Sequence, residues 1–77
     1  MTWYASGTQL GLGGEKTITY RSRESACVIE SRRRLIPHAS GSGGWLHTTY
    51  HLIRPDGTEK EYGRLRDAQR AAEEAGI

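Results

Sequence analysis

The pattern of apolar and polar positions is clearest in the C-terminal half of the chain. Residues 45–53 are rich in β-branched and aromatic side chains, a composition typical of a half-buried β-strand. Residues 54–57 read Arg-Pro-Asp-Gly, an order that favours a type I turn. A three-residue loop closed by Arg54 and Thr58 predicts a hairpin that pairs Leu52 with Lys60, Tyr50 with Tyr62, Ile53 with Glu59 and His51 with Glu61.

This register gives the predicted hairpin two chemically different faces. Antiparallel sheets commonly bury one face and leave the other in water. The face that we expect to be buried contains Leu46, Thr48, Tyr50, Leu52 and Tyr62. The face that we expect to be open contains Trp45, His47, Thr49, His51, Ile53, Glu59 and Glu61.

The spacing of apolar residues becomes helical after the hairpin. Leucine and alanine recur at intervals of three and four residues and form one stripe of small side chains over residues 65–75. A helix this short is marginal alone, so we expect it to pack on the face with Tyr50, Leu52 and Tyr62. Gly76 is placed to end the helix in the left-handed conformation, with Ile77 folding back on it.

The N-terminal half has weaker patterns. Residues 16–21 alternate apolar and polar side chains and predict a strand, and residues 27–36 are interpreted as a strand from their context. Residues 39–44 form a connector of hairpin-loop length, which leaves the register of the 27–36 strand open. Residues 3–12 add an optional short strand, and the glycine run at 11–14 is interpreted as a turn.

These elements predict an α+β fold, with a small antiparallel sheet of three to four strands and one C-terminal helix packed on one face. We expect a single domain over residues 1–77, in which a glycine-rich strand region (1–26) precedes a β-β-β-α core (27–77).

The composition indicates the cellular compartment in which the protein works. Its 77 residues include one cysteine, Cys27, so no intramolecular disulfide is available and a reducing compartment is favoured. No apolar run approaches the ~20 residues that cross a bilayer, and the N-terminus lacks the pattern of a secretory signal. We therefore expect a cytoplasmic protein without a membrane partner.

The charge is weak overall but concentrated in the middle of the chain. The net charge is +2, whereas residues 27–54 contain four arginines against one glutamate. Arginine suits pairing with phosphate or carboxylate groups, and a genome rich in G and C produces the same bias without functional meaning. Both explanations remain open.

The sequence gives little support for metal binding or catalysis. His47 and His51, on a strand that rises ~3.3 Å per residue, would have backbones ~13 Å apart, too far to share a tetrahedral ion. Cys27 lies between small apolar residues, as a core cysteine does. We expect no metal, no cofactor and no enzymatic activity.

The leading hypothesis is a small regulator or accessory protein, such as one from a phage or mobile element, that contacts duplex DNA through its sheet. Arginines would contact phosphates and guanine edges, and neutral polar side chains would read bases. Glutamates along the same strands favour the alternative of a salt-bridged surface. The candidate DNA contacts are Arg32, Arg33, Arg34, His47, Thr49, His51 and Arg54.

Residues 45–76 place a strand, a Pro-Asp-Gly turn, a strand ending in Tyr62 and the helical sequence from Leu65 to Glu73 in that order. This arrangement resembles the arm-type DNA-binding domain of phage-type tyrosine recombinases, in which a three-stranded sheet is combined with a helix. The resemblance covers about half the chain and implies that residues 27–36 form the strand inserted in the major groove. It also implies that Arg33, His47, Thr49 and His51 face the groove and that Arg54 contacts a phosphate.

A second hypothesis is a module that binds and modulates a host protein. Large side chains such as Trp45 and Ile53 would then be the anchors. A homodimer formed through an uncovered edge strand is a further possible outcome.

Overall fold

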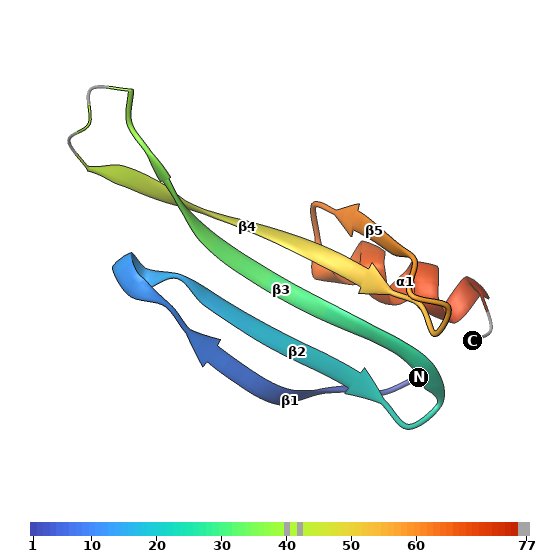
Figure 1. Cartoon of the computed structure of the whole chain (residues 1–77). Helices are drawn as coiled ribbons and strands as arrows, with labels where there is room; N and C mark the ends of the chain where they lie inside the picture. Colours follow the sequence, from blue (N-terminus) through green and yellow to red (C-terminus); the bar gives the residue numbers. More distant parts are fainter. Residues whose placement is uncertain (40, 42, 76–77) are drawn as a thin grey trace.

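The computed structural model describes residues 1–39, 41 and 43–75 of the chain. Within this part, the chain forms one five-stranded antiparallel sheet, whose strands lie in chain order, and one α-helix (Figure 1). The elements are β1 (Trp3–Leu10), a short 3₁₀ turn η1 (Leu12–Gly14), β2 (Lys16–Ser22), β3 (Ser25–Pro37), β4 (Gly44–Ile53), β5 (Glu59–Tyr62) and α1 (Leu65–Ala75).

The helix packs on the face of the sheet that the sequence predicts to be buried. Its small-residue stripe places Ala68 and Ala72, both fully buried, against Ile29 of β3 and Leu52 of β4. Cys27 completes this cluster, and Trp3, Tyr20, Tyr50, Tyr62, Leu65 and Ala71 pack around it. We call this side of the sheet the helix face and the other side the open face.

The predicted hairpin is confirmed in register and in loop length. Tyr50 lies opposite Tyr62 and Leu52 opposite Lys60. The Arg54 amide donates to the Thr58 carbonyl (2.9 Å), which closes the three-residue loop. The Asp56 carboxylate accepts hydrogen bonds from the Thr58 hydroxyl and amide, and these bonds lower the pKa of Asp56. The helix bounds also agree with the prediction, whereas the cap at Gly76 and Ile77 lies outside the described residues.

We expect Gly57→Ala to destabilise this hairpin. Gly57 has φ 90°, a conformation that costs an L-residue with a Cβ roughly 1–2 kcal/mol. Urea unfolding should show the loss as a lower midpoint with an unchanged m-value. Gly63→Ala is the matched control, because a Cβ at Gly63 meets nothing within 4 Å and its φ is not positive. Equal midpoints for the two variants would contradict the expectation.

The sheet has one strand more than the upper limit of the predicted three to four. Residues 3–10 form a full edge strand of eight residues, where the sequence indicated an optional short one. Its alternation is hidden by a bulge: Ala5 lies opposite Tyr20 and Gly7 opposite Thr19, so Ser6 is an extra residue. Because Trp3 and Tyr20 pack on the central cluster, residues 1–26 share one core with residues 27–77.

The strand at residues 27–36 is also confirmed, and its register is now defined. Pro37 lies opposite Gly44, and the pairing of β3 with β4 continues to Val28 opposite Ile53. The pairing of β2 with β3 ends at Lys16 opposite Arg33. Residues 34–37 and 44–47 therefore extend as a two-stranded ribbon at the end of the sheet distant from α1, in a molecule about 45 Å long (Figure 1).

Within the described residues, no helix is long and apolar enough to cross a membrane.

Candidate functional site

The register of β3 divides the three central arginines between the two faces. Arg32 lies opposite Thr49 and Arg34 opposite His47, so both arginines are on the open face. Arg33 lies opposite Thr48, on the helix face. The implied groove-facing set of Arg33, His47, Thr49 and His51 is therefore wrong in one member, because side chains of adjacent residues in a strand point to opposite faces.

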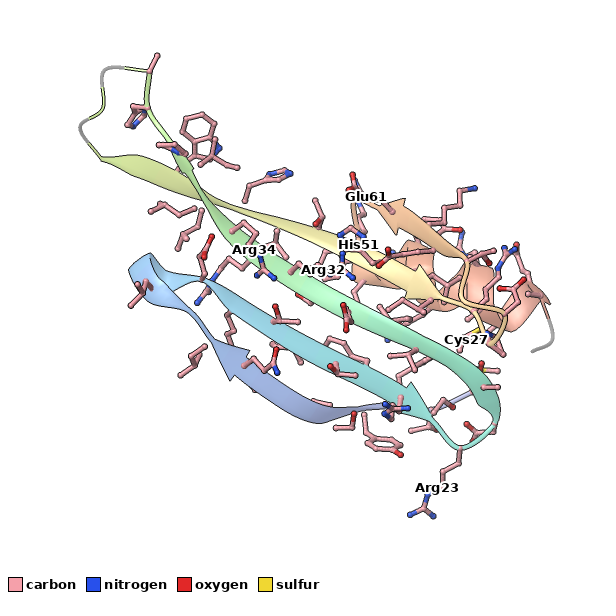
Figure 2. All side chains as sticks on the ribbon, in the orientation of Figure 1. Arg23, Cys27, Arg32, Arg34, His51 and Glu61 are labelled. Carbon is pink, nitrogen blue, oxygen red and sulfur yellow. The ribbon has the colours of Figure 1, made fainter. Side chains whose placement is uncertain are left out.

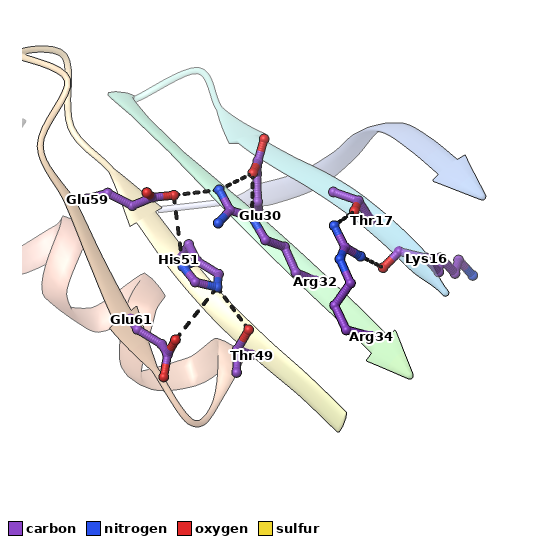
Figure 3. A network of polar contacts seen from close by, with 9 residues as sticks. All are labelled: Lys16, Thr17, Glu30, Arg32, Arg34, Thr49, His51, Glu59 and Glu61. Atoms are coloured by element: carbon purple, nitrogen blue, oxygen red, sulfur yellow. Dashed lines mark hydrogen bonds and ion pairs between the residues drawn. The ribbon is translucent and has the colours of Figure 1, made fainter. Parts of the chain in front are cut away.

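Arg32 is held between two carboxylates on the open face (Figure 3). Its guanidinium contacts Glu30 of the same strand at 2.6 Å and also pairs with Glu59 of β5. Burial lowers the pKa of Arg32, but the hydrogen bonds to the two glutamates outweigh it, so the pKa is raised. The charge of Arg32 is thus compensated inside the chain.

His51 belongs to the same polar network. Its Nε2 lies 2.8 Å from the Thr49 hydroxyl, and its ring nitrogens lie 3.8 Å from Glu59 and 4.0 Å from Glu61. The prediction that His51 lies next to Glu61 is confirmed. The imidazole of His51 is only 13% exposed. Three acidic side chains therefore surround Arg32 and His51 at the β5 end of the open face (Figure 3). Figure 2 shows Glu61 next to His51 in the whole molecule.

Arg34 lies farther along the ribbon and is exposed. Its guanidinium donates to the Thr17 hydroxyl (2.9 Å) and to the main-chain carbonyls of Arg33 (3.0 Å) and Lys16 (3.5 Å). These bonds fix the guanidinium over β2. Arg54 is exposed at the β4–β5 turn, at the opposite end of β4 from His47.

The two anchors predicted for protein binding are not brought together. Trp45 is half exposed at the distal end of β4, where its ring lies 5.3 Å from that of His38. Ile53 is eight residues away on the same strand, a distance of ~26 Å. A single cluster of contacts cannot use both residues as its centre.

The helix face has an uncovered end that the sequence reasoning missed. The helix contacts β3, β4 and β5 near the Ile29–Leu52 pair, and the ribbon extends beyond it (Figure 1). Leu35 and Leu46 lie opposite each other there, 41% and 45% exposed. We define the distal patch as Lys16, Ile18, Arg33, Leu35, Leu46 and Thr48, which share the helix face through their cross-strand pairing.

The turn η1 supports the distal patch from the side. A Cβ at Gly14 would lie 3.3 Å from the Leu46 side chain, and one at Gly13 would lie 3.0 Å from Leu35, so the glycine backbone packs closely on both leucines. Arg33 Nε donates to the Gly14 carbonyl (2.9 Å). The Glu15 carboxylate accepts from the Leu35 amide (3.0 Å). The glycine run is thus a turn, as predicted, and these contacts hold it against the β3–β4 ribbon.

The helix face is hollowed from the inner half of the distal patch towards α1. The hollow has a volume of about 210 Å³ and is lined by Lys16, Ile18, Tyr20, Ser31, Arg33, Thr48 and Tyr50. Its lining combines Ile18, Tyr20 and Tyr50 with polar side chains, and its two charged members, Lys16 and Arg33, are both basic and lie opposite each other. This surface can accept an apolar side chain next to a carboxylate.

The chain matches no family model, no curated protein and no solved structure among those compared.

Among the described residues, no group of three or more histidine, cysteine, aspartate or glutamate side chains is arranged to hold a metal ion. Cys27 is buried in the central cluster, distant in sequence and in packing from the exposed His38 and His47.

One length comparison could have revealed the distal patch from the sequence. A helix of 11 residues spans ~16 Å, whereas a strand of 10 residues spans ~33 Å. A single helix of this length leaves part of the same face uncovered.

Proposed function

We propose that this chain is a non-enzymatic module that binds another protein through the distal patch. The observation on which the proposal depends is that α1 covers one end of the helix face and leaves Leu35 and Leu46 exposed beside a hollow. Contiguous apolar surface next to a polar rim is typical of an interaction site.

The charges of the patch define the chemistry of the partner. Lys16 and Arg33 lie opposite each other between the leucine pair and Ile18, and the patch has no acidic member. A partner segment with leucine-type side chains spaced to cover Leu35 and Leu46, and with carboxylates next to them, would be complementary in shape and charge. An amphipathic acidic helix lying along the ribbon beyond α1 fits both requirements.

The open face supports DNA binding less well, and DNA binding stays a prediction. Arg32 is compensated by Glu30 and Glu59, and Arg34 is bonded to Thr17 and to carbonyl groups. Glu59 and Glu61 also place negative charge where a phosphate backbone would approach. A DNA complex would have to break these pairs or use the distal part of the face alone.

We expect Leu46→Lys and Arg33→Glu to prevent the capture of partner proteins from a lysate that the wild-type chain retains. The first variant places a charge in the apolar contact, and the second reverses the charge next to it. Quantitative mass spectrometry would identify proteins that both variants lose. Titration of such a purified protein should then show binding weakened at least 10-fold by each variant, the loss expected for a central interface residue.

Thr49→Lys is the matched control, because it adds a lysine to the open face of the same strand. Circular dichroism would establish that all three variants are folded. The proposal would be overturned if Thr49→Lys removed the same proteins, or if neither patch variant removed any. A fluorescence titration with random duplex DNA at two salt concentrations tests the competing hypothesis. Affinity that falls with log salt at a slope near −3 would favour the open face.

A further inference from the structure

The structure points to a second interaction surface, the outer edge of β1, and we infer that this edge pairs with the β1 strand of a second copy of the chain. β1 is one edge of the sheet, with β2 as its neighbour. An edge strand of eight residues presents main-chain donors and acceptors along its outer side. The inference concerns a different surface from the distal patch and does not depend on the proposed function.

The composition of β1 favours a partner identical to itself. Residues 1–14 contain no charged side chain, whereas the other edge strand, β5, contains Glu59, Lys60 and Glu61 in four residues. Charged side chains are a common protection of edge strands against pairing, and β1 lacks it. In a two-fold dimer, a side chain near the axis contacts the same residue or its sequence neighbours in the other copy. A neutral strand therefore avoids like-charge contacts across the axis.

Because of the bulge at Ser6, residues at equal distances from the two ends of β1 lie on the same face of the sheet. Through their partners on β2, Trp3, Ala5, Thr8 and Leu10 lie on the helix face and Tyr4, Gly7 and Gln9 on the open face. Antiparallel self-pairing that uses all eight residues places Trp3 opposite Leu10, Tyr4 opposite Gln9 and Ala5 opposite Thr8. Each of these pairs then shares a face, which register in a sheet requires.

Exposed apolar side chains are concentrated at this edge. Leu10 is 78% exposed and Leu12, two residues beyond it, 92% exposed. In the inferred register Leu10 would cover the Trp3 side chain of the other copy, next to the central cluster that Trp3 packs against. The dimer would join two five-stranded sheets into one continuous sheet with both helices on the same side.

Sedimentation velocity over a range of concentrations tests the inference. The wild-type mass should rise with concentration from 8.6 kDa towards twice that value. Leu10→Lys should weaken the dimer at least 10-fold, because it places a charge opposite Trp3. Leu46→Lys is the matched control and should leave the association unchanged. A wild-type chain that stays monomeric up to about 1 mM, or a dimer that resists Leu10→Lys and is lost in Leu46→Lys, would overturn the inference.

A disulfide experiment tests the register itself. Tyr4→Cys and Gln9→Cys each place a thiol at an exposed position, whereas the native Cys27 is buried. Mixed and oxidised, the two variants should form the heterodimeric disulfide, since opposite residues in antiparallel strands lie within disulfide reach. Each variant alone should not cross-link, because its two thiols would be about five residues, or ~17 Å, apart along the strands. Equal cross-linking in the mixture and in either variant alone would exclude this register.

The distal patch and the outer edge of β1 can be tested independently with the variants Leu46→Lys and Leu10→Lys. Leu46→Lys should lose partner proteins and keep the dimer, and Leu10→Lys should lose the dimer and keep the partner proteins. Failure of one proposal therefore leaves the other standing.

Discussion

Leu52→Ala is expected to lower the free energy of unfolding by about 2–5 kcal/mol, the range for removing a fully buried leucine. Leu52 is 1% exposed and lies opposite Ile29, beneath Ala68 and Ala72 of α1. A domain of 77 residues has a stability of ~4–12 kcal/mol, so this single change removes a large part of it. A loss of about 3 kcal/mol should lower the Tm by roughly 12–24 °C.

Thermal and urea unfolding followed by far-ultraviolet circular dichroism would measure this effect. Leu35→Ala is the matched control, because it removes the same atoms from a leucine that is 41% exposed in the distal patch. We expect that variant to unfold close to the wild type. Similar losses for the two variants would mean that Leu52 and its neighbours are not the centre of the core.

The sequence predicts the C-terminal half of the fold correctly because separate signals agree there. The Pro55-Asp56-Gly57 turn sets the loop length, and the positions of Tyr50, Leu52 and Tyr62 select the same register. The alanine stripe then identifies which face the helix covers. The structure confirms both the register and the packing. The register is strongly specified because a shift of one residue would place Tyr62 in water.

The N-terminal half was less predictable for two physical reasons. The bulge at Ser6 interrupts the period of two on which a strand prediction depends, so the sequence predicts only an optional short strand where β1 forms. The glycine-rich connector before β4 has no turn chemistry that fixes one register. The register of β3 with β4, from Val28 opposite Ile53 to Pro37 opposite Gly44, places Arg32 and Arg34, and not Arg33, on the open face with His47.

The candidate surfaces depend on long-range contacts that no local pattern contains. That Glu59 of β5 compensates Arg32 of β3 requires the order of three strands and the registers between them. The distal patch likewise forms because η1, from the first third of the chain, packs on Leu35 and Leu46. The run of three arginines predicts a basic surface, whereas Arg32 is paired with two glutamates and Arg33 lies on the opposite face from Arg32 and Arg34.

Ala68→Leu is expected to destabilise the protein by about 1–3 kcal/mol, the usual cost of adding methylene groups to a well-packed core. Ala68 is fully buried where α1 contacts the sheet, and the small side chain allows the helix backbone to lie close to Ile29 and Leu52. A leucine there must push the helix away from β3 and β4 or adopt an unfavourable rotamer. Ala75→Leu, at an exposed position at the end of the same helix, is the control and should be nearly neutral.

The Ala68→Leu variant also relates the core to the distal patch. Ala68 packs over the Ile29–Leu52 pair, whereas Leu46 lies six residues, or ~20 Å, farther along β4. Below its lowered Tm, the variant should therefore retain the partner proteins that Leu46→Lys loses, because the leucine pair and the turn η1 are unchanged. Urea midpoints and capture measured on the same preparations check both halves of this expectation. Loss of the partners from a variant that is still folded would instead place the binding surface on or next to α1.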